Sequence, residues 1–141
     1  MNDIQILART IYGEARGEYY RVDGGLSSLI AVGNVVKNRY RQQTWYGRTI
    51  AEVCQKPYQF SCWNPNDPNQ KLITMSIMDP LFDICLDVAG RIMKDEWPDL
   101  TRGCDHYHAS TMRTYPTWAL SAKPKLKIGQ HIFYDLSKRN K

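Results

Sequence analysis

Residues 1–40 carry apolar side chains at helical spacing. One buried helical face is predicted from five residues that recur at i, i+3, i+4, i+7 and i+11, namely Ile4, Leu7, Ala8, Ile11 and Ala15. Asn2 and Gln5 have the spacing of a variant capping box, which places the start of this helix. A second helix is predicted from about residue 23 to residue 40. It has few charges before Lys37, so we expect it to lie deep in the core. Its apolar stripe comprises Leu26, Leu29, Ile30, Gly33, Val36 and Tyr40.

The middle of the chain predicts two further helices with a long loop between them. Thr49 and Glu52 frame a short helix that continues through Cys54. The stretch 56–71 is rich in proline and asparagine, which predicts a loop, and long ordered loops are often functional. Asp79 and Pro80 then have the residue types of an N-cap and a first helical position, and the helix that they start is expected to run until Pro98 ends it.

The last third of the chain changes to the period of a β-strand. Cys104, His106 and His108 alternate with Asp105 and Tyr107, and a second alternating stretch spans 126–134. These patterns predict a small antiparallel sheet that closes one side of a helical domain. The predicted fold class is therefore α+β, mainly helical, with the sheet in the C-terminal third.

Composition and charge narrow the class of protein. The chain has 141 residues, of which 43% are hydrophobic and 23% charged, which excludes a disordered chain and leaves room for one domain, 1–141. The formal net charge of +5 favours a polyanionic partner, which could be nucleic acid, an anionic membrane or an acidic cell-wall polymer.

The start of the chain and its apolar stretches indicate where in the cell the protein is made and whether it inserts into a membrane. Residues 1–5 have neither the basic cluster nor the apolar segment of a secretory signal. The longest mostly apolar stretch, 26–36, is far shorter than a membrane span. We therefore expect a protein that is made in the cytoplasm without a signal peptide and has no stable membrane insertion, and we expect it to be a monomer.

Cysteine and histidine usage argues against disulfides and metal. Four cysteines form no C-x-x-C pair, so free thiols are expected at Cys54, Cys62, Cys85 and Cys104. Cys104, His106 and His108 could share one face of a strand. Their spacing suits a tetrahedral zinc site poorly, however, and no fourth ligand is evident. We predict no metal and no cofactor.

Glu14 is the first candidate for catalytic chemistry. It follows Ile11 by three positions, which puts it at the edge of the apolar helical face. A carboxyl group there is partly desolvated, which favours its protonated form, as a general acid requires. Gly13 and Gly17 flank it at a cost to helix stability, which could allow a bulky ligand close to the backbone. The alternative is that Glu14 pairs with Arg9 or Arg16 and that the glycines end the helix.

Glu18 lies one helical turn after Glu14 and is a candidate second carboxylate. Two acids on one helix about 6 Å apart along its axis do not readily flank a sugar bond, because most glycosidase pairs face each other from separate elements. Glu18 is therefore interpreted as a group that modulates Glu14 or binds substrate, or as a salt-bridged surface residue.

The 56–71 loop has the residue mixture that proteins use to hold sugars. Aromatic faces stack on sugar rings while amides and hydroxyls bind sugar hydroxyls, and the same mixture could instead fix the loop to the core. The candidates are Gln59, Phe60, Ser61 and Trp63, with Tyr58 and Asn64 beside them. Trp118 follows Pro116 and could line a cleft or serve in packing.

Nucleic acid is not favoured as the partner. The basic residues are dispersed, with mild clusters at 39–41 and 123–127 and at the C-terminal end, and no recognition module matches. The chain also has no phosphate-binding glycine loop and no serine-nucleophile signature.

Four blocks of the sequence, in order, carry a resemblance to a known family. The run 8–18, ARTIYGEARGE, resembles the signature of the SleB-type cell-wall hydrolases, a family founded on spore cortex-lytic enzymes. The segments 31–39, 59–64 and 106–109, followed by 116–118 and 128–134, resemble its later parts. The segment 19–25 is a few residues longer than in the family. These 141 residues show no peptidoglycan-binding module or export signal, so we expect a protein that resembles a phage lysin.

The resemblance implies a lysozyme-like or lytic-transglycosylase-like domain that acts on peptidoglycan, with Glu14 matching the family's catalytic glutamate. On this basis Glu14 would be the general acid and base for cleavage between N-acetylmuramic acid and N-acetylglucosamine. Attack by the muramic C6 hydroxyl would give 1,6-anhydro products, whereas attack by water would make the enzyme a hydrolytic muramidase. The candidates for orienting the sugar are Gln59, Ser61 and Tyr107, with His106 and His131 as further ones.

The expected setting is host-cell lysis of the phage type, in which the protein reaches the wall after holin release or from a virion. Two other classes of protein remain as alternatives. A glycan-binding protein without catalysis would use the same aromatic residues and release no fragments. A basic nucleic-acid binder would lose DNA affinity steeply with salt.

Overall fold

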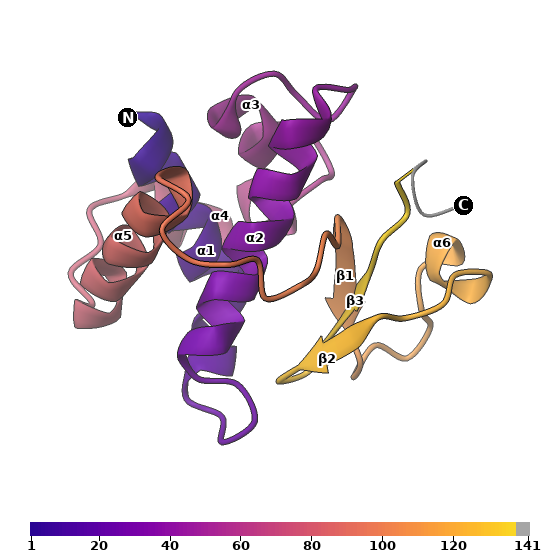
Figure 1. Cartoon of the computed structure of the whole chain (residues 1–141). Helices are drawn as coiled ribbons and strands as arrows, with labels where there is room; N and C mark the ends of the chain where they lie inside the picture. Colours follow the sequence, from indigo (N-terminus) through magenta and orange to yellow (C-terminus); the bar gives the residue numbers. More distant parts are fainter. Residues whose placement is uncertain (138–141) are drawn as a thin grey trace.

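The computed structural model describes residues 1–137, and it confirms an α+β fold with the helices first (Figure 1). The helical part lies on one side of the molecule, and the small sheet with α6 lies on the other. The elements in chain order are α1 (Asp3–Tyr19), α2 (Leu26–Gln42), α3 (Ile50–Gln55), the 3-10 helix η1 (Ser61–Trp63), α4 (Pro68–Thr74), α5 (Pro80–Met93), β1 (His106–Ala109), α6 (Thr117–Leu120), β2 (Leu126–Ile128) and β3 (His131–Tyr134).

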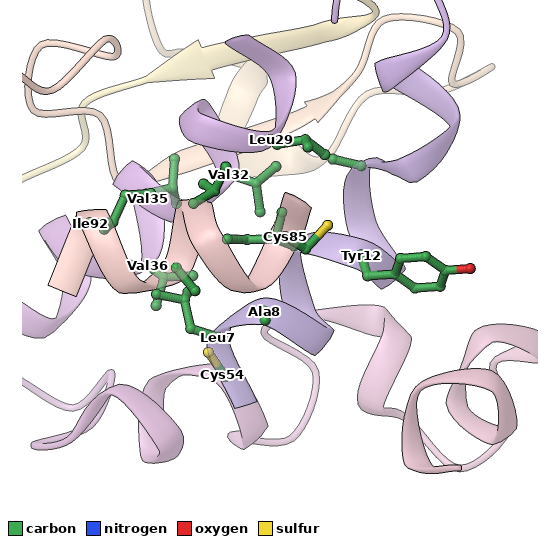
Figure 2. Packing of buried hydrophobic residues seen from close by; sticks show 14 of the residues in the cluster. Leu7, Ala8, Tyr12, Leu29, Val32, Val35, Val36, Cys54, Cys85 and Ile92 are labelled. Carbon is green, nitrogen blue, oxygen red and sulfur yellow. The ribbon is translucent and has the colours of Figure 1, made fainter. Parts of the chain in front are cut away.

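The core is formed where α1, α2 and α5 meet. Side chains of the three helices point toward one another there, as Figure 2 shows for Leu7, Val36 and Ile92. The predicted buried face of α1 is confirmed, since Leu7, Ala8, Ile11 and Ala15 are buried and Ile4 is half-buried. The second helix is as deep as its low charge predicts, because every residue from 28 to 39 is buried.

The helix starts follow the predicted capping residues. The Asn2 side chain accepts a hydrogen bond from the Gln5 N–H at 2.9 Å, and the Gln5 side chain accepts one from the Asn2 N–H, which completes the capping box. Thr49 caps α3 through the Glu52 N–H, and Asp79 caps α5 through the Leu81 N–H. Local side-chain hydrogen bonds therefore set where these helices begin.

The prediction of an unbroken loop over 56–71 is wrong. The structure places η1 and the start of α4 inside it. Asp67 accepts a hydrogen bond from the Asn69 N–H at 2.8 Å, and Pro68 occupies the first turn of α4. This is the same Asp-Pro start as at Asp79 and Pro80, and the surrounding prolines obscured it.

Two helix boundaries also differ from the sequence-based prediction. The second helix begins at Leu26 and not near residue 23, because Gly25 has a φ of +66° and lies outside the helix. Leu26 itself is exposed and takes no part in the core. The fourth predicted helix ends at Met93, well before Pro98, and Asp95 turns the chain with a φ of +55°. The short helix α6 was not predicted.

The sheet has the strand order β1-β3-β2, with both pairs antiparallel. Its strand β1 begins at His106, so the prediction that the strand includes Cys104 is wrong. Tyr107 lies opposite Phe133, and Ala109 lies opposite His131. The rings of Tyr107, His131 and Phe133 contact one another on one face. His106, His108 and Tyr134 contact Trp118 of α6 on the other face.

The four cysteines are free and buried, as their spacing predicted. Within residues 1–137, no helix is both long enough and apolar enough to cross a lipid bilayer. The predicted basic cluster at the C-terminal end includes Lys138, Arg139 and Lys141, which lie outside the described residues.

Candidate active site

Glu14 lies on α1 where the helix faces both η1 and the sheet. Its side chain is half-buried, and both carboxylate oxygens have protein partners. The Tyr107 hydroxyl donates a hydrogen bond to Oε1, and the Cys62 backbone N–H donates to Oε2 at 3.2 Å. Three segments that are far apart in sequence therefore meet at this carboxylate.

The alternative in which Glu14 pairs with Arg9 or Arg16 does not describe the structure. Arg9 donates hydrogen bonds to the carbonyl oxygens of Ile73 and Met75, at 2.5 and 2.7 Å. Arg16 donates to Asn69 Oδ1 at 2.6 Å. Both arginines tie α1 to α4 and the segment after it, and this leaves the Glu14 carboxylate to Tyr107 and Cys62.

Gly13 allows η1 to approach α1 beside Glu14. A Cβ atom at Gly13 would lie 2.8 Å from Cys62 Cβ and 3.0 Å from Cys62 Sγ, closer than side-chain atoms pack. The glycine therefore makes room for η1 and not for a ligand, and the helix continues past Gly17 to Tyr19. Burial raises the pKa of the Cys62 thiol well above its ordinary value, and the adjacent Glu14 carboxylate adds to that rise.

We expect Gly13→Ala to lower both stability and activity. The added methyl group would push Cys62 away from α1 and pull its N–H from Glu14, and overpacking of this kind costs about 1–3 kcal/mol. Chemical denaturation and wall-lysis assays would measure the two effects. Gly17→Ala is the matched control, because open space surrounds that position. A Gly13→Ala variant as stable and active as Gly17→Ala would contradict this account of the glycine.

Tyr107 reaches Glu14 from β1 and is held by the rings around it. Its ring centroid lies 4.7 Å from that of His131, 5.6 Å from that of Phe133 and 6.5 Å from that of Phe60. Burial, and then the Glu14 carboxylate, raise the pKa of Tyr107 well above its usual value. The hydroxyl is therefore protonated at neutral pH and can donate to Glu14.

Arg39 brings a buried positive charge close to this cluster. Its Nε donates to the Asp105 carbonyl oxygen at 2.7 Å, and its Nη1 donates to Gln59 Oε1 at 2.8 Å. The guanidinium stacks over Tyr46 and Phe60, 4.9 Å from each ring centroid. Burial lowers the Arg39 pKa, and attraction to nearby groups that include Tyr107 and Glu14 opposes this. An arginine stays protonated in proteins, so Arg39 holds a buried positive charge beside this cluster.

Sequence reasoning did not select Arg39. A charged residue inside a helix that is otherwise buried is the signal that could have identified it. Cys62 was also missed as a ligand of Glu14, because the group that it supplies is a backbone N–H, which no residue type reveals.

Asp105 fixes the start of the sheet. The carboxylate is fully buried and accepts hydrogen bonds from the ring of His106, the Leu136 N–H and the Gln42 side chain, each at 2.9 Å. Burial alone would raise its pKa, but these hydrogen bonds outweigh burial and lower it. Asp99 is the same case, with hydrogen bonds from Asn38 and Thr101 that lower its pKa against burial.

These two lowered pKa values predict a loss of stability in acid. The stabilisation is complete above the ordinary aspartate pKa of about 3.9 and is lost as the pH falls through the lower pKa of the folded state. Urea unfolding between pH 6 and pH 2.5 should show a falling free energy of unfolding below about pH 4. Asp105→Asn should be less stable than the wild type at pH 6, and its free energy of unfolding should fall less between pH 6 and pH 2.5. An equally steep fall in Asp105→Asn would contradict the assignment, with Asp83→Asn at the surface as the control.

The loop candidates lie in or just before η1, which contacts Glu14 through the Cys62 N–H, and they differ in exposure. Ser61 is exposed at the start of η1, next to Cys62. Gln59 is half-buried, and its Nε2 has no partner in the described structure. Phe60 is buried under Arg39, so its ring faces no solvent. Trp63 is half-buried and donates from Nε1 to Thr10 Oγ1 at 2.9 Å, which ties η1 to α1.

Glu18 and His131 lie where the C-terminal end of α1 meets the turn between β2 and β3. Glu18 accepts a hydrogen bond from the Gln130 N–H at 2.5 Å. His131 is buried against Tyr107, with its Nδ1 unpaired in the described structure. Burial lowers the His131 pKa, and the Glu18 carboxylate opposes this, so the imidazole is neutral at neutral pH. The substrate-binding roles of both residues stay predictions.

His106 and Trp118 lie on the face of the sheet that is turned away from Tyr107. Their rings pack together, with centroids 4.8 Å apart. The His106 Nδ1 is engaged by Asp105, and both ring nitrogens of His108 are engaged, by the Ala109 carbonyl oxygen and the Tyr134 hydroxyl. Residues 1–137 contain no cluster of three His, Cys, Asp or Glu side chains arranged to hold a metal ion. The structure therefore gives His106 and Trp118 a packing role, and contact with substrate stays a prediction.

The site is therefore a half-buried glutamate that lies between a helical lobe and a small sheet. Residues 25–134 match the model of the cell wall hydrolase family, and the chain belongs to that family. The matched range begins after Glu14, so the family match itself does not cover this residue.

Solved structures and a curated relative agree with this family. The chain is similar to the catalytic domain of the SleB protein of Bacillus cereus, with 27% identity, a TM-score of 0.67 and coverage of 94% of this chain and 89% of that one. It is similar to the catalytic domain of the germination-specific lytic transglycosylase SleB of Bacillus anthracis, with 25% identity, a TM-score of 0.70 and coverage of 96% and 95%. A spore cortex-lytic enzyme of Oceanobacillus iheyensis is 26% identical, and the chain spans 41% of its length.

Proposed function

We propose that this protein cleaves the glycan strands of peptidoglycan, with Glu14 as its catalytic acid and base. The observation that carries the proposal is the Glu14 carboxylate, which is held on one oxygen by Tyr107 and on the other by the Cys62 N–H. A proton donor must keep one orientation relative to the bond that it cleaves, and these two hydrogen bonds supply that orientation. Membership in the cell wall hydrolase family supports peptidoglycan as the substrate.

The proposed bond is the β-1,4 link between N-acetylmuramic acid and N-acetylglucosamine. Protonated Glu14 donates its proton to the bridging oxygen as the bond from that oxygen to muramic C1 breaks, and positive charge develops at C1. The muramic C6 hydroxyl then attacks C1, and the Glu14 carboxylate takes the hydroxyl proton. The proton that Glu14 gave is thereby returned, and the product is a 1,6-anhydro sugar.

We propose the muramic C6 hydroxyl as nucleophile because the two carboxylates considered for this task are already engaged by protein groups. Hydrolytic glycosidases use a second carboxylate as nucleophile or as the base that activates water. Glu18 is engaged by the Gln130 N–H, and Asp105 is buried with three hydrogen-bond donors around it. Neither is free for that task. This supports a lytic transglycosylase over a hydrolytic muramidase.

Three residues near Glu14 are proposed to orient the sugar. Ser61 offers an exposed hydroxyl next to the residue whose N–H binds Glu14. The Gln59 amide nitrogen is buried and has no protein partner in the described structure, so Gln59 would have to turn outward to bind the sugar. Tyr107 lies directly on the carboxylate. Hydroxyl and amide groups of this kind match the N-acetyl and hydroxyl groups of the substrate.

Digestion of dye-labelled sacculi tests the proposed activity against simple binding. The enzyme should release soluble labelled fragments with time, and no new peptide amino groups should appear. A glycan-binding protein without catalysis would pellet with the sacculi and release nothing. Binding without release would contradict the proposal.

The biological setting that we propose is lysis of a host cell wall in the manner of a phage lysin. A net charge of +5 suits attraction to an acidic wall polymer. Expression in the bacterial cytoplasm should then leave the culture intact, and coexpression with a pore-forming protein should cause lysis. Equal lysis without the pore, or no lysis with it, would contradict this setting.

A further inference from the structure

Glu18 binds the turn between β2 and β3. Its Oε1 accepts a hydrogen bond from the Gln130 N–H at 2.5 Å, across 112 positions of sequence. The side chain is only 13% exposed, and its ion pair with Arg21 is long, at 4.0 Å. The closest partner of this charge is therefore a backbone N–H of the sheet, and not a basic side chain.

The turn is built around the Glu18 carboxylate. Gly129 has a φ of +57°, and a Cβ atom there would lie 2.5 Å from Glu18 Oε1 and 3.2 Å from Ser28 Oγ. The Gly129 N–H also donates to the Asp23 carbonyl oxygen at 2.8 Å. The residue at 129 must be a glycine both for its left-handed backbone and for the close approach of Glu18. The two contacts fix the turn against the end of α1 and the segment after it.

The position of this turn is coupled to Tyr107. The strand β3 begins at His131, directly after Gln130, and the His131 ring packs against the Tyr107 ring at 4.7 Å. Tyr107 in turn donates its hydroxyl to Glu14. Helix α1 thus contacts the sheet through two carboxylates one turn apart. Glu14 contacts the Tyr107 side chain of β1, and Glu18 contacts the Gln130 backbone in the turn.

We propose that Glu18 is a positioning residue for Glu14, and that it acts by holding the sheet where the Tyr107 hydroxyl reaches the Glu14 carboxylate. This inference rests on the proposed function of Glu14. It assigns Glu18 no proton transfer and no contact with substrate. What Glu18 supplies is one accepting oxygen.

The glutamine and alanine variants of Glu18 separate this role from a catalytic one. Glu18→Gln keeps an accepting oxygen for the Gln130 N–H, so its kcat on sacculi should stay close to the wild-type value. Glu18→Ala removes the acceptor, and small misplacements of reacting groups lower rates on the order of ten- to a hundredfold, so kcat should fall by that factor with little change in KM. Equal losses in both variants would show that the charge itself is needed and would overturn the proposal, as would full activity in Glu18→Ala.

A double-variant test identifies the route through Tyr107. In a Tyr107→Phe background the hydroxyl that Glu18 positions is gone, so adding Glu18→Ala should cost much less than it costs alone. Additive losses would overturn the proposal.

Gly129→Ala perturbs the same contact from the turn and should lower kcat as Glu18→Ala does. A Gly129→Ala variant with wild-type kcat would also overturn it. Asp83→Ala, an exposed change on α5, is the control.

An NMR measurement tests the coupling without any activity. In Glu18→Ala the Gln130 amide should exchange faster, and the carboxyl carbon resonance of Glu14 should shift. Faster exchange with an unmoved Glu14 resonance would overturn the proposal. If the wild type released no fragments from sacculi while these signals moved as expected, the proposed function would fail and the positioning contact would stand.

Discussion

Replacement of Glu14 by glutamine is expected to remove nearly all activity and to leave the fold intact. The amide oxygen can still accept a hydrogen bond from the Cys62 N–H, and the amide nitrogen can donate to the Tyr107 hydroxyl, which rotates to accept it. What glutamine cannot do is donate and recover a proton. General acid–base catalysis contributes about 10²–10⁴-fold, so kcat on purified sacculi should fall by a factor in the upper part of that range.

The control for this experiment is Glu52→Gln, which changes an exposed glutamate of α3 in the same way. Thermal unfolding should show both variants folded. A Glu14→Gln enzyme that lyses sacculi at nearly the wild-type rate would remove Glu14 from the mechanism. Lysis by neither Glu14→Gln nor Glu52→Gln would indicate a defect of the preparation, which the unfolding curves would reveal.

Replacement of Tyr107 by phenylalanine should have the second-largest effect. The variant keeps the ring contacts with His131, Phe133 and Phe60 and loses only the hydroxyl that donates to Glu14. A hydrogen bond to a charged group is worth about 1.5–3 kcal/mol, so kcat should fall roughly ten- to a hundredfold if the Glu14 orientation is what the hydroxyl maintains. KM should change little.

The measurement is steady-state kinetics on soluble glycan chains, with Tyr115→Phe as the matched control. Tyr115 is exposed, and its hydroxyl donates to the Ser110 carbonyl oxygen, away from Glu14. Loss of the Tyr115 hydroxyl should leave kcat unchanged. A Tyr107→Phe variant in which KM rises while kcat is preserved would mean that the hydroxyl binds the substrate and does not orient the acid.

Much of the helical part could be predicted from local sequence because its causes are local. The spacing of Leu7, Ala8 and Ile11, with the Asn2 cap, determined the first helix, and the capping residues of α3 and α5 determined where those helices begin. The loop prediction over 56–71 failed because proline and asparagine serve both loops and helix starts. The Asp67 cap became visible only once the backbone around it was known.

Glu14 and Tyr107 were both candidates from the sequence, but the contact between their side chains was not predicted. Glu14 could be selected because helical spacing and a family resemblance agreed on it. Its partners come from contacts that no local pattern encodes, since Tyr107 lies 93 positions away and the Cys62 donor is a backbone group. His106 and Tyr107 were both candidates, but they lie on opposite faces of the sheet and only Tyr107 contacts Glu14. Strand alternation turns neighbouring side chains to opposite faces, and the sequence does not say which face meets α1.

The most direct test of the central claim is mass spectrometry of the fragments that the wild-type enzyme releases from purified sacculi. We predict disaccharide-peptide products that end in 1,6-anhydro-N-acetylmuramic acid, each lighter by one water than its hydrolysed counterpart, and none from the Glu14→Gln enzyme. Fragments with reducing muramic acid ends would contradict the internal attack by the C6 hydroxyl. Fragments cut only at peptide or amide bonds would contradict glycan cleavage by Glu14 altogether.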